Sequence, residues 1–178
     1  MAILCCPLSR VAAIVASRRP GRVISLLDPD WAFPELGPEY AGRHLRLSFH
    51  DAHVAENEQV VPSAAAVRTL LAFLTTWQNH GSLLVHCRAG IGRSTAGAFI
   101  AACVAHPNTD ERDIARALRQ ASPFARPNEL LVLLADREMG REGRMHRAIT
   151  STGHGLPAIA ADENEPFELE LHGGDRAA

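Results

Sequence analysis

Short apolar runs alternate with longer segments along the chain, and the spacing of the apolar residues separates strands from helices. Residues 43–51 alternate apolar and polar side chains, which is the period of a strand with one buried face. Residues 82–86, of sequence SLLVH, form a continuous apolar run, as expected for a central strand covered on both faces. Two further apolar runs, at residues 2–6 and 22–28, complete the set of predicted strands.

Helices are predicted between and after these strands. A Pro-Ser pair begins the helix of residues 62–81, and a glycine ends it. Residues 93–106 are small and apolar on all sides, which favours a buried helix. Further helices are predicted at residues 9–22, 109–122 and 127–141. Because strands alternate with helices, we predict an α/β fold: a single domain with a central, mostly parallel sheet flanked by helices.

The periodic pattern fades after Arg147. Residues 162–178 hold six acidic residues and one arginine, so they carry a charge of −5, while the rest of the chain carries +3. We therefore expect one domain at residues 1–147 and an acidic, weakly ordered C-terminal tail at residues 148–178. Two alternatives stay open. The tail could fold back over a basic face of the domain as a pseudo-substrate, or its FELEL segment could pair as an edge strand.

The composition is ordinary for a globular protein, with 47% hydrophobic and 21% charged residues. The net charge of −2 gives no general attraction to nucleic acid or to an anionic membrane, so neither is expected as a partner. The N-terminus lacks the basic region of a signal peptide, and no apolar run has the length of a membrane span. The four cysteines do not have the spacing of a zinc site or of a disulfide framework, so we expect no metal and a reducing cytoplasm.

The candidate chemistry lies in residues 83–95, LLVHCRAGIGRST, where an apolar strand ends at a cysteine. The backbone N–H groups of residues 88–93 can curl around one point, and the following helix adds its positive N-terminus. Two glycines allow backbone conformations that bulkier residues resist. Such a ring of donors suits a phosphate dianion, and Arg93 supplies a planar fork for two of its oxygens. The same positive potential stabilises Cys87 as a thiolate, which is its nucleophilic form.

The segment HCRAGIGRST resembles the His-Cys-x-x-Gly-x-x-Arg-Ser/Thr signature of the cysteine-dependent protein tyrosine phosphatase superfamily. The short chain resembles the compact, dual-specificity-like bacterial branch of that superfamily. The resemblance implies a phosphotyrosine phosphatase-like fold and a phosphomonoester hydrolase with a covalent phosphocysteine intermediate. It also implies a phosphorylated protein or a small phosphomonoester as substrate, phosphate or another oxyanion in the site, and no cofactor.

The resemblance implies a role for each position of the motif. Cys87 corresponds to the nucleophile, Arg93 to the phosphate-binding arginine, and Ser94 to the hydroxyl that eases thiolate departure. His86 corresponds to the residue that orders the loop and helps to keep the thiol ionised. The backbone amides of the phosphate loop correspond to those of Arg88, Ala89, Gly90, Ile91, Gly92 and Arg93.

A general acid upstream of the motif is implied as well, because a departing oxide leaves more easily when it is protonated. Asp51 follows a predicted strand and opens a loop, so it is the leading candidate. His53, Glu56 and Glu58 on the same loop are alternatives. Asp51 could also be an ordinary turn residue.

Several residues around the expected pocket have two interpretations. In compact family members a Pro-Asn pair opens a late helix near the phosphate loop, so Asn128 could support that loop, position the hydrolytic water, or only cap its helix. Arg88 could face the pocket mouth or the solvent. Trp31, Phe33 or Tyr40 could stack on a phosphotyrosine ring or could anchor their own loop.

Two other function classes are compatible with a thiolate in an oxyanion-binding loop. One is a non-catalytic phosphate- or phosphoprotein-binding module, which keeps the loop but has lost turnover. The other is sulfur transfer. The presence of the cysteine, the arginine and an upstream acid together favours a phosphatase over the binding module. The histidine before Cys87 and the Arg-Ser ending of the motif favour a phosphatase over sulfur transfer.

Overall fold

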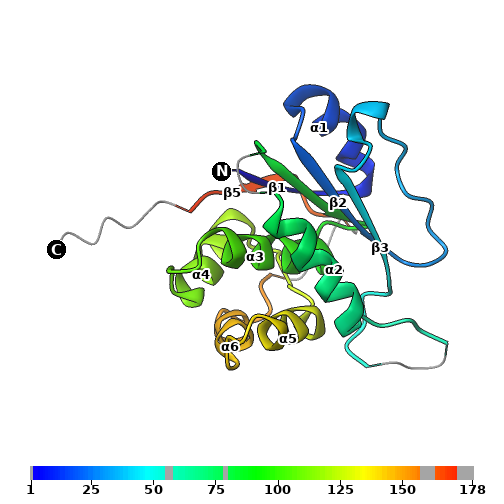
Figure 1. The fold of residues 1–178 in the computed structure, drawn as a ribbon. Coiled ribbons are helices and arrows are strands. Elements are labelled where there is room, and N and C mark those ends of the chain that lie inside the picture. The colour runs from blue at the N-terminus through cyan, green and yellow to red at the C-terminus, as the bar shows by residue number, and fades with distance from the viewer. Residues whose placement is uncertain (1, 55–57, 78–79, 157–162, 172–178) are drawn as a thin grey trace.

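The computed structural model describes residues 2–54, 58–77, 80–156 and 163–171. Its centre is a five-stranded sheet with the strand order β3-β2-β4-β1-β5 (Figure 1). The first four strands along the chain run parallel, and β5 is antiparallel to β1. The strands are β1 (Ile3–Pro7), β2 (Arg22–Leu27), β3 (His44–Ser48), β4 (Leu83–Cys87) and β5 (Phe167–Leu169). The predicted α/β fold with a mostly parallel sheet is confirmed.

The helices cover the two faces of the sheet unequally. Helix α1 (Val11–Arg18) lies on one face, whereas α2 to α6 lie together on the other (Figure 1). The helices of the larger layer are α2 (Ala64–Thr75), α3 (Arg93–Ala105), α4 (Glu111–Ala121), α5 (Glu129–Glu138) and α6 (Arg144–Ser151). Two short 3-10 helices complete the described elements, η1 (Leu8–Arg10) and η2 (Pro38–Tyr40).

The main core lies between the sheet and the larger helical layer. Helix α3 is buried along most of its length and packs on β1 and β4, as its all-apolar sequence predicted. Its small residues permit this approach: a Cβ added at Gly97 would lie 2.9 Å from Val85. A smaller core under α1 contains Tyr40 beside apolar residues of β1, β2 and β4. Burial of this apolar surface is the main stabilising contribution to the fold.

Two elements lie in the region that the sequence assigned to a C-terminal tail. Helix α6 crosses the expected boundary between residues 147 and 148, and Ala148 and Ile149 are buried in the main core. The boundary therefore falls inside a packed helix, because its apolar residues recur at helical spacing. Strand β5 corresponds to the edge-strand alternative. Residues 157–162 and 172–178 lie outside the described residues, so a weakly ordered tail stays a prediction there.

In the described part of the chain, no helix combines the length and the apolar character needed to cross a bilayer.

Candidate active site

The candidate site lies at the edge of the sheet where the parallel strands end. Strand β4 ends at Cys87, Asp28 directly follows β2, and Asp51 lies shortly after β3. These three residues line one pocket of about 480 Å³, together with residues of the loop between β4 and α3. This location agrees with the general rule that ligands bind outside the carboxyl ends of parallel strands.

The loop of residues 88–92 connects β4 to α3 and turns sharply at Gly90. Gly90 has a φ of +75°, in the left-handed region, and a Cβ there would lie 2.9 Å from the backbone nitrogen of Pro7. Both the conformation and the close packing against β1 therefore favour glycine. The N–H of Gly90 donates to Sγ of Cys87 at 3.2 Å. Helix α3 begins directly after the loop, so its positive N-terminus lies beside the same pocket.

The thiol of Cys87 is only 2% exposed and has two hydrogen-bond neighbours. Besides the N–H of Gly90, the hydroxyl of Ser94 lies 3.1 Å from Sγ. An N–H donor and a hydroxyl donor both stabilise a thiolate more than a thiol. The arrangement therefore suits a sulfur nucleophile, and Ser94 lies where it can hydrogen-bond to that sulfur.

The guanidinium of Arg93 is 4% exposed and is held by two acceptors. Its Nη1 donates to the carbonyl oxygen of Phe49 at 2.6 Å, and its Nη2 donates to Oδ2 of Asp28 at 3.1 Å. Its Nε is buried without a hydrogen-bond partner among the described residues, and such a donor fits an anionic ligand. Sequence reasoning did not single out Asp28. The signal that could have found it is an aspartate directly after a predicted parallel strand.

Asp51 lies against the loop and is held by Asn128. Its carboxylate occupies the space that a Cβ at Gly92 would need. Nδ2 of Asn128 donates to Oδ1 of Asp51 at 2.7 Å, while Oδ1 of Asn128 accepts from the N–H of Leu131 at 2.9 Å. The backbone N–H of Asn128 also donates to the carbonyl oxygen of Gly92 at 3.3 Å. Asn128 therefore both caps α5 and joins Asp51 to the loop.

The rival general acids are less well placed than Asp51. His53 lines the same pocket, but it is exposed, and no hydrogen bond among the described residues holds its side chain beside the loop as Asn128 holds Asp51. Glu58 is exposed and does not line the pocket. Glu56 lies outside the described residues. The other carboxylate of the pocket, Asp28, is paired with the arginine, so Asp51 is the carboxylate best placed to donate a proton.

His86 lies inside the sheet behind the loop. Its Nε2 is 2.5 Å from the hydroxyl of Ser25, which is 2.7 Å from Nε2 of His44. Burial lowers the pKa of His86 to about 4, with a smaller contribution from His44. Its imidazole is then neutral near pH 7 and cannot supply positive charge to a thiolate at Cys87. Of the two expected roles of His86, the geometry supports the ordering of the strand end.

Arg88 and Trp31 interact beside the pocket. Arg88 lines the pocket and is exposed, and its guanidinium carbon lies 5.0 Å from the centroid of the Trp31 ring. This distance is typical of a cation–π contact. Trp31 is 41% exposed, whereas Tyr40 is buried in the smaller core and Phe33 is partly buried. Trp31 is therefore the aromatic residue of that loop with a ring near the pocket.

Asn164, from the C-terminal segment, supports the loop from behind, and sequence reasoning missed it. It is 7% exposed, and its N–H donates to the carbonyl oxygen of Ala89 at 2.7 Å. Its Nδ2 donates to the carbonyl oxygen of Gly90 at 3.3 Å and to the hydroxyl of Ser122 at 2.7 Å. In a trans peptide the next N–H points opposite to the carbonyl. Holding these carbonyls outward therefore turns the loop amides toward the other side, where the sulfur lies.

Two further expectations concern the C-terminal segment and metal ions, and both are answered here for the described residues alone. Residues 163–171 do not line it, so the described part of that segment does not act as a pseudo-substrate in the site. No group of three or more His, Cys, Asp or Glu side chains in the described residues is arranged to hold a metal ion.

Comparisons with known proteins agree with this geometry. A family model described as protein-tyrosine phosphatase matches residues 49–125, which include both the leading candidate acid and the phosphate loop. No curated protein sequence matches the chain.

Solved structures match over most of the chain. The human tyrosine phosphatase-like serine/threonine/tyrosine-interacting protein is 19% identical, with a TM-score of 0.60 over 79% of this chain and 92% of its own. DUSP15 is 20% identical, with a TM-score of 0.57 over 86% and 94%. PTPMT1 in complex with PI(5)P is 16% identical, with a TM-score of 0.55 over 84% and 93%. At these identities the likeness shows a shared fold.

Proposed function

The chain belongs to the cysteine-dependent protein tyrosine phosphatase superfamily, and on this premise we propose that it is a phosphomonoester hydrolase of the tyrosine or dual-specificity type. The observation that carries the proposal is the buried thiol of Cys87, which shares one pocket with Arg93 and Asp51. A thiolate, a fixed guanidinium and a carboxylic acid are the three groups that phosphoryl transfer through cysteine requires.

In the first step the phosphoryl group of the substrate binds in the loop. The loop amides and the guanidinium of Arg93 donate hydrogen bonds to its non-bridging oxygens. Sγ of Cys87 attacks phosphorus, so a phosphorus–sulfur bond forms as the bond from phosphorus to the leaving oxygen breaks. Asp51 gives its proton to that oxygen, and Asn128 holds the Asp51 carboxyl beside the loop.

In the second step water hydrolyses the phosphocysteine. The carboxylate of Asp51 accepts a proton from the attacking water, whose oxygen forms a bond to phosphorus as the phosphorus–sulfur bond breaks. The hydroxyl of Ser94, 3.1 Å from Sγ, donates a hydrogen bond to the departing thiolate. The products are inorganic phosphate and the free enzyme.

The proposed substrate is a phosphorylated protein or a small phosphomonoester. The exposed ring of Trp31 beside Arg88 offers a surface on which the ring of a phosphotyrosine can stack. PTPMT1 has been solved with PI(5)P, a phosphoinositide. The phosphate loop has no lysine here, which weakens the case for a phosphoinositide, while Arg88 and Arg126 are the cationic side chains that line the pocket besides Arg93. The cytoplasmic location and the bacterial origin stay predictions.

Hydrolysis of aryl phosphates tests the proposal. Cys87→Ser should abolish turnover while phosphate still raises the melting temperature by binding the native state. Asp51→Asn should slow the hydrolysis of poor leaving groups by roughly 10²- to 10⁴-fold and that of activated ones far less, because only the former need protonation. Cys103→Ser, at a buried cysteine outside the pocket, is the matched control and should keep its activity.

Other outcomes would assign a different function. Turnover by Cys87→Ser would exclude Cys87 as the nucleophile. A wild-type protein that binds phosphate without turnover would instead be a phosphate-binding module. A panel of phosphotyrosine, phosphoserine and phosphothreonine peptides with inositol phosphates then identifies the substrate class.

A further inference from the structure

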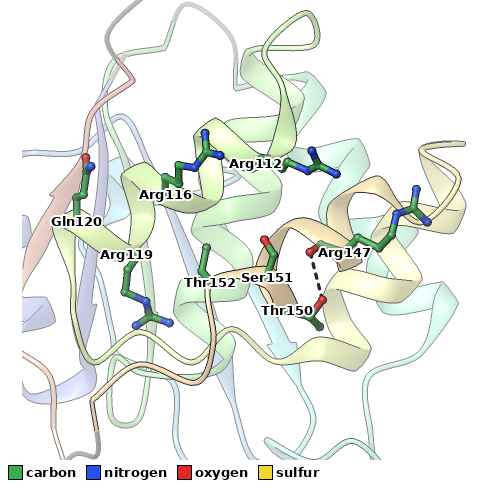
Figure 2. Close-up of a pocket in the computed structure, with 8 residues that line it drawn as sticks. All are labelled: Arg112, Arg116, Arg119, Gln120, Arg147, Thr150, Ser151 and Thr152. Atoms are coloured by element: carbon green, nitrogen blue, oxygen red, sulfur yellow. Dashed lines mark hydrogen bonds between the residues drawn. The ribbon is translucent and has the colours of Figure 1, made fainter.

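A groove of about 860 Å³ lies between α4 and α6, outside the candidate active site (Figure 2). Four arginines from the two helices line it, and no carboxylate of the described residues does. The lining residues are Arg112, Arg116, Arg119 and Gln120 from α4, and Arg147, Thr150, Ser151 and Thr152 from α6 and its C-terminus. We call this feature the arginine groove.

Helical spacing gathers these arginines on one side of the molecule. Arg112, Arg116 and Arg119 follow one another at intervals of four and three residues, so they share one face of α4. Helix α6 packs against α4 and adds Arg147. Figure 2 shows Thr150 and Ser151 between the α4 arginines and Arg147. The groove is therefore a built concave surface with cationic groups on both sides.

Of the four groove arginines, only Arg116 forms an ion pair among the described residues, and Arg116 also lines an adjoining hollow that contains Asp113, Glu168 and Glu170. Arg116 has a carboxylate partner, Asp113, at 2.8 Å, but both side chains are exposed and such pairs are weak. Arg147 donates to the backbone carbonyl of Glu142 at 3.1 Å, which is uncharged. Among the described residues, Arg112 makes no ion pair.

Arg119 is fixed in place by backbone contacts. Its Nη1 donates to the carbonyl oxygen of Pro123 at 2.7 Å, and its Nη2 donates to that of Gly153 at 2.8 Å. Its Nε is buried without a partner in the described part of the chain. Burial lowers the pKa of Arg119, and the nearby Arg126 lowers it further. This corner of the molecule therefore has a positive potential that an anion would relieve.

The groove continues toward the active-site pocket. Thr150 lines both the groove and a smaller hollow of about 340 Å³. That hollow shares His53 and Arg126 with the active-site pocket. The carboxylate in the hollow, Glu129, lies 3.6 Å from Nε2 of His146. One extended chain can therefore follow these hollows from the phosphate loop to the arginine groove.

We propose that the arginine groove binds an acidic or additionally phosphorylated segment of a phosphoprotein whose target phosphoresidue occupies the active site. The inference rests on the proposed function and names the substrate class for it. Guanidinium groups bind carboxylates and phosphates through paired hydrogen bonds, and arginine clusters are a recurrent way to recognise acidic motifs. The described groove residues include no aromatic or large aliphatic side chain of the kind that base stacking or bilayer insertion uses.

Matched variants test the groove. The groove variant Arg112→Gln/Arg116→Gln/Arg147→Gln removes three exposed charges that lie outside the active-site pocket. The control variant removes three exposed arginines that line neither the groove, the hollow nor the active-site pocket: Arg10→Gln/Arg43→Gln/Arg46→Gln.

The substrates are phosphotyrosine peptides of equal length, with either an acidic or a neutral tract on one side of the phosphotyrosine. We expect the wild type to prefer the acidic peptides by roughly tenfold in kcat/KM, because several exposed charge contacts of modest strength combine. The groove variant should lose this preference mainly through KM, while the control variant keeps it. Both variants should hydrolyse a small aryl phosphate as the wild type does, and added salt should weaken the preference.

Direct binding separates this inference from the proposed function. A fluorescent acidic peptide without phosphotyrosine should bind the wild type, measured by anisotropy, and bind the groove variant more weakly. That result supports the groove even if no phosphate ester is hydrolysed. If the wild type hydrolyses aryl phosphates but has the same kcat/KM for acidic and neutral peptides, the arginine groove does not bind the substrate, and the proposed function still stands.

The same binding measurement can also be made with other anionic ligands. Binding of phosphatidylserine-containing vesicles or of single-stranded RNA through these arginines, with no binding of the acidic peptide, would overturn the assignment to a phosphoprotein. If the groove variant does not fold, the same peptide measurements are made with the single variant Arg112→Gln, and Arg10→Gln is its control.

Discussion

Two residues of different segments fix the position of Asp51. The carboxylate lies where a Cβ of Gly92 would be, and Nδ2 of Asn128 donates to its Oδ1 at 2.7 Å. Asp51 is itself exposed, so burial does not hold it in place. Its placement beside the loop therefore depends on the absence of a side chain at Gly92 and on the amide of Asn128.

Replacement of Asn128 by serine separates this positioning from helix capping. A serine oxygen can still accept the N–H of Leu131 as an N-cap, but it is too short to replace the amide contact to Asp51. We expect kcat for a poor leaving group to fall about tenfold or more with little change in KM, because a displaced acid transfers its proton less efficiently. Steady-state kinetics with leaving groups of different acidity measures this.

The alanine variant provides the control for capping. Asn128→Ala should show the same loss of kcat and should also lose about 1 kcal/mol of unfolding free energy, because the cap of α5 is gone. If Asn128→Ser lowers kcat equally for poor and activated leaving groups, Asn128 acts on the phosphate loop and not on Asp51.

Local sequence could fix relative positions only for the residues that one turn brings together, whereas Asp51 and Asn128, from other segments, were candidates through the family resemblance. Cys87, Arg93 and Ser94 lie within a single strand-loop-helix unit, so their relative positions follow from local geometry. Asp28 and Asn164 reach the loop from the end of β2 and from the C-terminal segment. Their approach depends on the order of the strands and on the packing of the chain end, which local periodicity does not determine.

Among the secondary-structure elements, β2, β3 and β4 are joined by a polar chain across the sheet. Ser25 of β2 lies between His44 of β3 and His86 of β4. Burial lowers the pKa of both histidines to about 4, so both are neutral near pH 7. Because His86 precedes Cys87, this chain also fixes the end of the strand that presents the thiol.

Acid should therefore destabilise the sheet. The unfolded chain binds protons at histidine with a pKa near 6.5, whereas the folded chain resists them down to about 4. The stabilising contribution is thus fully present above pH 6.5 and is lost as the pH falls toward 4. We expect the unfolding free energy to fall by about 1–3 kcal/mol over this range, measured by urea unfolding at a series of pH values.

Variants of the two histidines show whether they cause this pH dependence. In His44→Gln/His86→Gln the unfolding free energy should change little between pH 4 and 6.5, even if the variant is less stable overall. The exposed His80 gives a control, and His80→Gln should keep the wild-type curve. An unchanged slope in the double variant would assign the effect to other groups.

Periodicity located the strands well, because each has either a continuous apolar run or strict alternation. It did not locate α6, which has only eight residues and three buried ones, Met145, Ala148 and Ile149. These three residues recur at helical spacing, but over eight residues they form too short a pattern to predict a helix, and the stability of α6 comes from packing against α4 and α5. The sequence therefore could not show that the main core extends past residue 147.

Over the whole molecule, the C-terminal segment closes onto the first strand and onto the back of the phosphate loop (Figure 1). Strand β5 pairs with β1, and Glu168 forms an ion pair with Arg18 of α1 at 2.6 Å. Asn164, just before β5, donates to two carbonyl groups of the loop. The described segment therefore acts as a support of the candidate site, which ties the order of the loop to the folding of the chain end.

Replacement of Asn164 by alanine tests whether its side chain supports the phosphate loop. Asn164→Ala leaves the carbonyl of Gly90 and the hydroxyl of Ser122 without a buried partner, so we expect a loss of about 1–3 kcal/mol in unfolding free energy, measured with urea. Glu165→Ala, at the exposed neighbour, is the control and should be neutral. Phosphate should also raise the melting temperature of Asn164→Ala less than that of the wild type, because binding must then order the loop. Equal shifts with phosphate would mean that Asn164 stabilises the fold without organising the loop, and an unchanged unfolding free energy would contradict the contact itself.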